Sequence, residues 1–72
     1  MCLVTVYMED RGQEEEVMQD VAWIEFKDDE LLMVTLLGEE KRFHGKMKSI
    51  DLLNSSVVLK GEENMHGAPP TG

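Results

Sequence analysis

The sequence predicts a small all-β protein in which five or six short strands close into a barrel. Short segments rich in β-branched and aromatic residues alternate apolar with polar positions, as strands do. Turns of a few residues separate these segments, and no segment is convincingly helical. With 72 residues, the chain is expected to form one domain.

The first strand is expected over residues 2–8, which read CLVTVYM. Gly12 marks a turn, and the short connection RGQ suits a hairpin that leads into a second strand over residues 14–20. A helix is the alternative for this part of the chain, because Val17, Val21 and Ile24 fall at helical spacing. The β-branched and aromatic content and the period-2 pattern that follows favour strands.

A third strand is expected over residues 21–27 (VAWIEFK), followed by a turn at DDE that contains no glycine. Residues 31–37 read LLMVTLL and are apolar at both odd and even positions. A strand with this pattern is buried on both faces, either inside a closed barrel or at a subunit interface.

Residues 41–53 (KRFHGKMKSIDLL) predict a long strand, and Gly45 inside it predicts a bulge or a sharp bend that would help a barrel to close. After a turn at NSS, residues 57–60 (VVLK) form the last strand. SH3-like, Sm-like and OB-like barrels all fit this pattern. The domain is expected to span residues 1–61. Residues 62–72, rich in Gly, Pro and polar side chains, are predicted to be a flexible tail.

The net charge of −8 argues against a nucleic-acid partner, because phosphates require a basic surface. A local basic patch is conceivable at KRFHGKMK, although acidic runs flank it. The N-terminal sequence lacks the basic region of a signal peptide, and no apolar run approaches the ~20 residues of a membrane span. We therefore expect a cytoplasmic protein without a membrane partner, in which a lone thiol stays reduced.

The sequence does not predict an enzyme. A nucleophilic thiol needs a neighbouring base, and the two histidines are His44 and His66, the second of which lies in the predicted tail. A glycine-rich phosphate loop, a paired-cysteine motif and an HExxH motif are all missing from the sequence.

Cys2 is the single cysteine of the chain. One interpretation is a small buried hydrophobic residue at the start of a strand. The other is a metal ligand. If Met1 is removed, the Cys2 amine and thiolate form a five-membered chelate, and if Met1 stays, the Cys2 amide nitrogen replaces the amine. Two chains together supply two sulfurs and two nitrogens, a square-planar set that suits Ni(II) or Cu(II). This interpretation predicts a symmetric dimer with Cys2 near the two-fold axis.

Four stretches resemble the CooT family of small nickel-binding proteins: MCLVTVY, MQDVAWIEF, LLGEEKRFHGKMKSIDL and VVLKG, which together span residues 1–61. The resemblance implies an Sm-like barrel that forms a homodimer. It also implies one Ni(II) per dimer, held by the paired Cys2 thiolates with backbone nitrogens of Cys2 and Leu3 as further candidate donors. His44 and His66 match no metal-binding position of the family.

The implied role is nickel handling or delivery during maturation of carbon monoxide dehydrogenase, with that enzyme or its maturation proteins as partners. The alternative is an Sm-like RNA-binding or protein-interaction module in which Cys2 is structural. Sm-like folds bind RNA elsewhere, but fold analogy alone does not establish a function.

Overall fold

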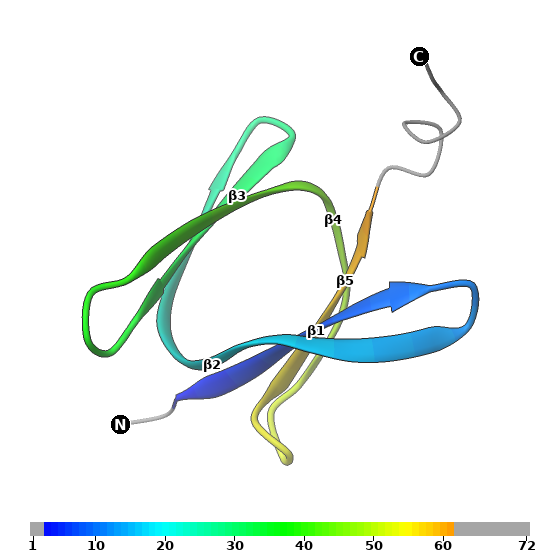
Figure 1. Ribbon diagram of the computed structural model, residues 1–72, viewed down its shortest axis with the longest axis horizontal. Helices are drawn as coiled ribbons and strands as arrows, with labels where there is room; N and C mark the ends of the chain where they lie inside the picture. Colours follow the sequence, from blue (N-terminus) through cyan, green and yellow to red (C-terminus); the bar gives the residue numbers. More distant parts are fainter. Residues whose placement is uncertain (1–2, 62–72) are drawn as a thin grey trace.

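The computed structural model describes residues 3–61, which form five strands and no helix. The strands are β1 (Val4–Asp10), β2 (Gln13–Lys27), β3 (Glu30–Thr35), β4 (Glu40–Asp51) and β5 (Ser56–Gly61). Successive strands pair antiparallel, and β5 returns to pair with β1, so that one sheet closes into a barrel (Figure 1). With five strands that alternate in direction, the first and last run the same way, which explains why β1 and β5 are parallel. The all-β prediction is confirmed.

The core consists of the side chains that point into the closed sheet. Alternate residues of β3 are buried, because successive side chains of a strand point to opposite faces. β1, β2 and β5 contribute the remainder, and the buried apolar cluster is Val6, Val21, Leu31, Met33, Val57 and Leu59. The outer positions of β3 are only half-buried, so the expectation of a strand buried on both faces holds for one face within this single chain.

The predicted second and third strands are one continuous strand, which corrects the sequence interpretation. β2 bends within its length, because Asp20 adopts a left-handed φ of 56° and the register shifts on both sides of Val21. Such irregularities sharpen the twist and bend of a strand. As a result, the first part of β2 pairs with β1 and its last part pairs with β3.

The glycine-containing hairpin is confirmed. Arg11 and Gly12 have φ values of 56° and 80°, as expected for a two-residue turn with two left-handed positions. The glycine-free turn at Asp28 and Asp29 is also present, with Asp28 at a left-handed φ of 50°.

β4 changes partners at the predicted bend. Residues up to His44 pair with β3, whereas Gly45 and those beyond it pair with β5. Gly45 has a φ of 154°, and a Cβ at this position would lie 2.6 Å from the carbonyl oxygen of Lys60. Only glycine therefore fits at this point without local displacement.

Two apolar segments predicted as strand are turns instead. Leu36 and Leu37 follow the end of β3, and Leu52 and Leu53 follow the end of β4. The first turn is closed at Thr35, whose hydroxyl oxygen accepts a hydrogen bond from the Glu39 amide at 3.0 Å. Both strands therefore end two residues earlier than their apolar runs. The predicted tail, residues 62–72, lies outside the described residues.

Candidate functional site

The predicted metal ligand Cys2 lies outside the described residues, as does His66. Leu3, whose backbone nitrogen is a candidate donor, is described; it is half-buried and directly precedes β1. Among residues 3–61, no group of three or more His, Cys, Asp or Glu side chains could hold a metal ion.

The start of β1 is hydrogen-bonded to one turn and lies near a second. The Thr5 amide donates a hydrogen bond to the carbonyl oxygen of Ser55 in the β4–β5 turn, at 2.9 Å. Val4 pairs with Val21 of β2, next to the point where the Leu36 amide donates to the Asp20 carbonyl, also at 2.9 Å. Figure 1 shows the beginning of β1 between the β3–β4 and β4–β5 turns.

These two turns carry exposed leucine side chains. Leu37 is 90% exposed and Leu53 is 97% exposed, and Leu36 and Leu52 are also more than half exposed. Each turn thus exposes two leucine side chains to water, which is unfavourable for apolar surface. We call the end formed by these two turns and the start of β1 the apolar end.

The β4–β5 turn is fixed by one carboxylate. Oδ1 of Asp51 accepts hydrogen bonds from the Leu53 and Asn54 amides at 3.1 and 3.2 Å, and Oδ2 accepts one from the Asn54 side chain at 2.7 Å. The Asn54 side-chain bond, followed by its backbone bond, lowers the pKa of Asp51 below its ordinary value. The ionised carboxylate is therefore the form that holds this turn.

We expect Asn54→Ala to raise the pKa of Asp51 toward the ordinary aspartate value. In the wild-type chain the pKa of Asp51 is lower in the folded state than in the unfolded state. The contribution of Asp51 to the free energy of unfolding is therefore complete above the unfolded-state pKa, and it is lost as the pH falls through the folded-state pKa. A carboxyl carbon NMR titration measures this value. Gln19→Ala, which removes the amide partner of Glu16 instead, is the matched control and should leave Asp51 unchanged. An unchanged pKa in Asn54→Ala would contradict the assignment.

His44 belongs to a separate surface. Its Nε2 lies 3.3 Å from Oε2 of Glu30, and Arg42 lies 3.7 Å from the other oxygen of the same carboxylate. Lys48 forms an ion pair with Glu9 at 2.7 Å. Arg42 and Lys48, two cations of the sequence cluster KRFHGKMK, are thus paired with carboxylates.

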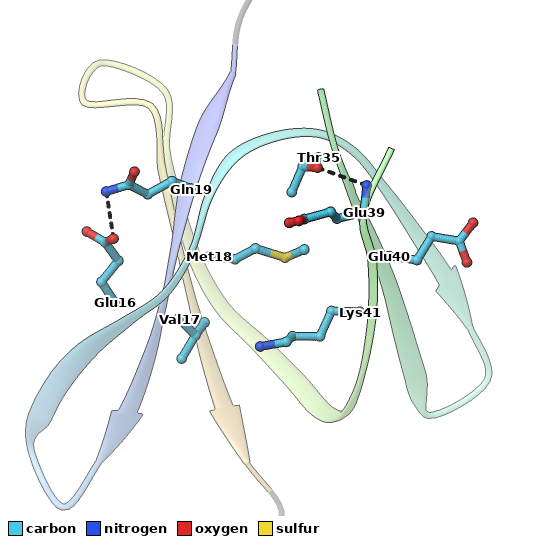
Figure 2. A pocket seen from close by; sticks show the side chains of 8 residues that line it. All are labelled: Glu16, Val17, Met18, Gln19, Thr35, Glu39, Glu40 and Lys41. Atoms are coloured by element: carbon cyan, nitrogen blue, oxygen red, sulfur yellow. Dashed lines mark hydrogen bonds between the residues drawn. The ribbon is translucent and has the colours of Figure 1, made fainter. Parts of the chain in front are cut away.

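A groove lies between β2 and the beginning of β4. Its volume is about 670 Å³, and Figure 2 shows Val17 and Met18 of β2 facing Lys41 of β4 across it. Thr35 and Glu39 border it at the β3–β4 turn, whereas Glu16, Gln19 and Glu40 point outward. The sequence analysis did not predict this groove, because it forms only where the two bent strands diverge.

Comparison with known proteins identifies the family. The family described as "CO dehydrogenase accessory protein CooT" matches residues 1–60. The chain belongs to the CooT family. CooT is an accessory protein of CO dehydrogenase and not itself an enzyme, which confirms the resemblance and the non-enzymatic prediction.

Two further proteins are similar to this CooT chain. An uncharacterized protein of Methanocaldococcus jannaschii is 34% identical over 61 residues, which cover 85% of this chain and 100% of that protein. A crystal structure assigned to CooT from Carboxydothermus hydrogenoformans matches with a TM-score of 0.79 at 21% identity, covering 85% of this chain and 98% of that one. At this identity the structural match shows a shared fold. Within residues 3–61, no helix is long and apolar enough to cross a membrane.

Proposed function

We propose that this CooT chain forms a homodimer that binds one Ni(II) between its two Cys2 residues and serves the maturation of CO dehydrogenase. The observation that carries the proposal is the apolar end. The start of β1, next in sequence to Cys2, lies between two turns that expose four leucines. If two copies bury these leucines against each other, both chain starts approach the same two-fold axis.

The proposed donor set fits Ni(II). We also propose that the protein resides in the cytoplasm. The paired Cys2 thiolates would hold the ion, and backbone nitrogens of Cys2 or Leu3 would complete two sulfur and two nitrogen donors, a set suited to square-planar Ni(II). The nickel ion is the cargo in this proposal. The chain's contribution is to hold the thiolates at the dimer axis, and the hydrogen bond from the Thr5 amide to Ser55 of the β4–β5 turn helps to fix the start of β1 for this role.

The five-stranded barrel agrees with an Sm-like or SH3-like classification, which we include in the proposal. The RNA-binding alternative requires a continuous basic face. Arg42 pairs with Glu30, and Lys48 pairs with Glu9. Lys41 points into the groove. These arrangements do not favour a continuous basic face. A nickel titration of the reduced chain and of Cys2→Ser tests the metal proposal.

We expect Leu53→Asp to weaken the homodimer by at least about tenfold, because a carboxylate would replace an apolar side chain at the buried interface. Analytical ultracentrifugation over a range of concentrations measures the dissociation constant. Phe26→Asp is the control, because Phe26 is also exposed but lies beside the β2–β3 turn, on the far side of the ring from the chain start in Figure 1. Equal weakening by both variants would argue against the apolar end as the interface.

A further inference from the structure

The first part of β2 has a neighbouring strand on one side only. Its residues from Gln13 to Met18 pair with β1, whereas the pairing of β2 with β3 begins at Val21. Within residues 3–61, the opposite edge of this first part has no strand beside it. An edge of this kind presents unpaired N–H and C=O groups to a partner.

The hairpin geometry identifies the unpaired backbone groups. In a two-residue hairpin, the residues that flank the turn, Asp10 and Gln13, exchange hydrogen bonds, and so do Met8 and Glu15 two positions away. Glu14 and Glu16 occupy the alternate positions, so their N–H and C=O groups point away from β1. The Thr5 amide agrees with this alternation, since it donates toward β5 rather than β2.

The groove described above continues this edge. Residues 16–19 all line it, which shows that the backbone edge of β2, and not one face of the strand, forms its wall. Val17 and Met18 supply apolar contacts inside it, and both pack partly against the core. A strand added beside Glu14 and Glu16 would extend its next side chains into this groove.

The charge of the edge selects the occupant. Glu14, Glu15 and Glu16 are all exposed, and none of them takes part in an ion pair within the described part of the chain. A second copy of the same edge would place glutamate opposite glutamate, which is destabilising, whereas lysine or arginine opposite each glutamate is favourable. The chain's own residues 62–72 fit poorly as well, since they contain Glu62, Glu63 and two prolines.

We propose that the free edge at Glu14 and Glu16 binds an extended, lysine- or arginine-rich segment of a partner protein by strand addition, with an aliphatic side chain of that segment in the groove at Val17 and Met18. Main-chain hydrogen bonds supply affinity in this mode, and side-chain sites supply specificity. The proposal is independent of nickel and of the dimer, because it uses neither Cys2 nor the apolar end.

The test uses a peptide of about nine residues with blocked, uncharged termini, in which lysine alternates with valine and threonine. At roughly 3.3 Å per residue, this peptide is long enough to span the edge. We expect saturating peptide to slow hydrogen exchange of the Glu14 and Glu16 amides by at least about tenfold, as new main-chain hydrogen bonds require. A peptide N-methylated at every second residue, which cannot donate along one edge, should bind more weakly.

Matched variants separate this edge from general attraction to an acidic protein. We expect Glu14→Lys to weaken peptide binding about tenfold, equivalent to about 1.4 kcal/mol, and Glu14→Gln to weaken it less. Asp29→Lys makes the same charge change in the β2–β3 turn and should have a small effect. Amide NMR spectra establish that each variant is folded.

Several results would overturn the proposal. These are no binding, binding without slower amide exchange, equal binding of the N-methylated peptide, and equal effects of Glu14→Lys and Asp29→Lys. Protection of the Glu14 and Glu16 amides that rises with protein concentration, without peptide, would show that a second copy occupies the edge and would also overturn it. Nickel stoichiometry plays no part in these readouts, so the two proposals fail separately.

Discussion

Cys2→Ser is expected to lower the affinity of the protein for Ni(II) by more than about a hundredfold, since loss of groups that only support a ligand already costs about 10–100-fold. The reduced wild-type chain should saturate at one Ni(II) per two chains. Its thiolate-to-nickel charge-transfer absorption should disappear in Cys2→Ser. Ultraviolet–visible titration and native mass spectrometry provide the affinity, the spectrum and the stoichiometry.

The histidines provide the control for this experiment. His44 is paired with Glu30 on a strand face apart from the chain start, so His44→Ala should leave nickel binding unchanged. His66→Ala tests the second imidazole in the same way. Nickel binding that survives Cys2→Ser, or that is lost in His44→Ala, would contradict the Cys2 site and return the RNA-binding and protein-interaction alternatives to first place.

The dimer and the metal can be tested independently. Leu53→Asp alters the interface without altering a donor, whereas Cys2→Ser alters a donor without altering an apolar turn residue. If nickel is shared between chains, it should also raise the stability of the dimer, because a ligand that binds only the assembled form stabilises that form. Nickel-dependent recovery of the Leu53→Asp dimer would link the two properties.

Much of the fold was predictable because its signals are local. The turn at Gly12 and the bend at Gly45 both depend on backbone conformations that glycine adopts readily, and both occur as predicted. The strand over residues 31–35 was also predictable from its apolar and β-branched side chains, although the sequence pattern did not show which face is buried. Each of these features depends on a few neighbouring residues.

The continuity of β2 was less predictable. Asp20 reads as a turn residue, and its left-handed φ agrees with that preference, yet the chain continues as strand on both sides of it. The pairing partners on each side, β1 and β3, determine whether such a residue ends a strand or only bends it. Those partners are distant in sequence, so the local pattern could not distinguish the two outcomes.

The candidate functional site was less predictable from the sequence than the fold. The choice of Cys2 rested on its being the single thiol and on the family resemblance, and its position remains a prediction. The exposed leucines were misread as strand, because apolar residues in a turn look like the continuation of an apolar strand. Only the hydrogen bonds of Thr35 and Asp51 with the residues that follow them show that the strands end there. The free edge of β2 likewise depends on which strands fail to pair.

Gly45→Ala is expected to lower the free energy of unfolding by about 2–4 kcal/mol, since overpacking and left-handed backbone strain each cost about 1–3 kcal/mol. The added Cβ would lie 2.6 Å from the Lys60 carbonyl oxygen and 2.6 Å from Cε2 of Phe43. The Phe43 ring can rotate, but the carbonyl belongs to β5, which pairs with both β1 and β4. Relief of the clash therefore requires the barrel itself to open locally.

Gly12→Ala is the matched control for Gly45→Ala. Gly12 has a φ of 80° but nothing within 4 Å of an added Cβ, so this variant bears the backbone cost without the clash, about 1 kcal/mol. Urea unfolding followed by far-ultraviolet circular dichroism, at one protein concentration, compares the two variants. If Gly45→Ala is no less stable than Gly12→Ala, β4 does not need the close approach at Gly45 to change partners. A larger loss of stability in Gly45→Ala than in Gly12→Ala would show that this single contact between β4 and β5 limits how the sheet can close.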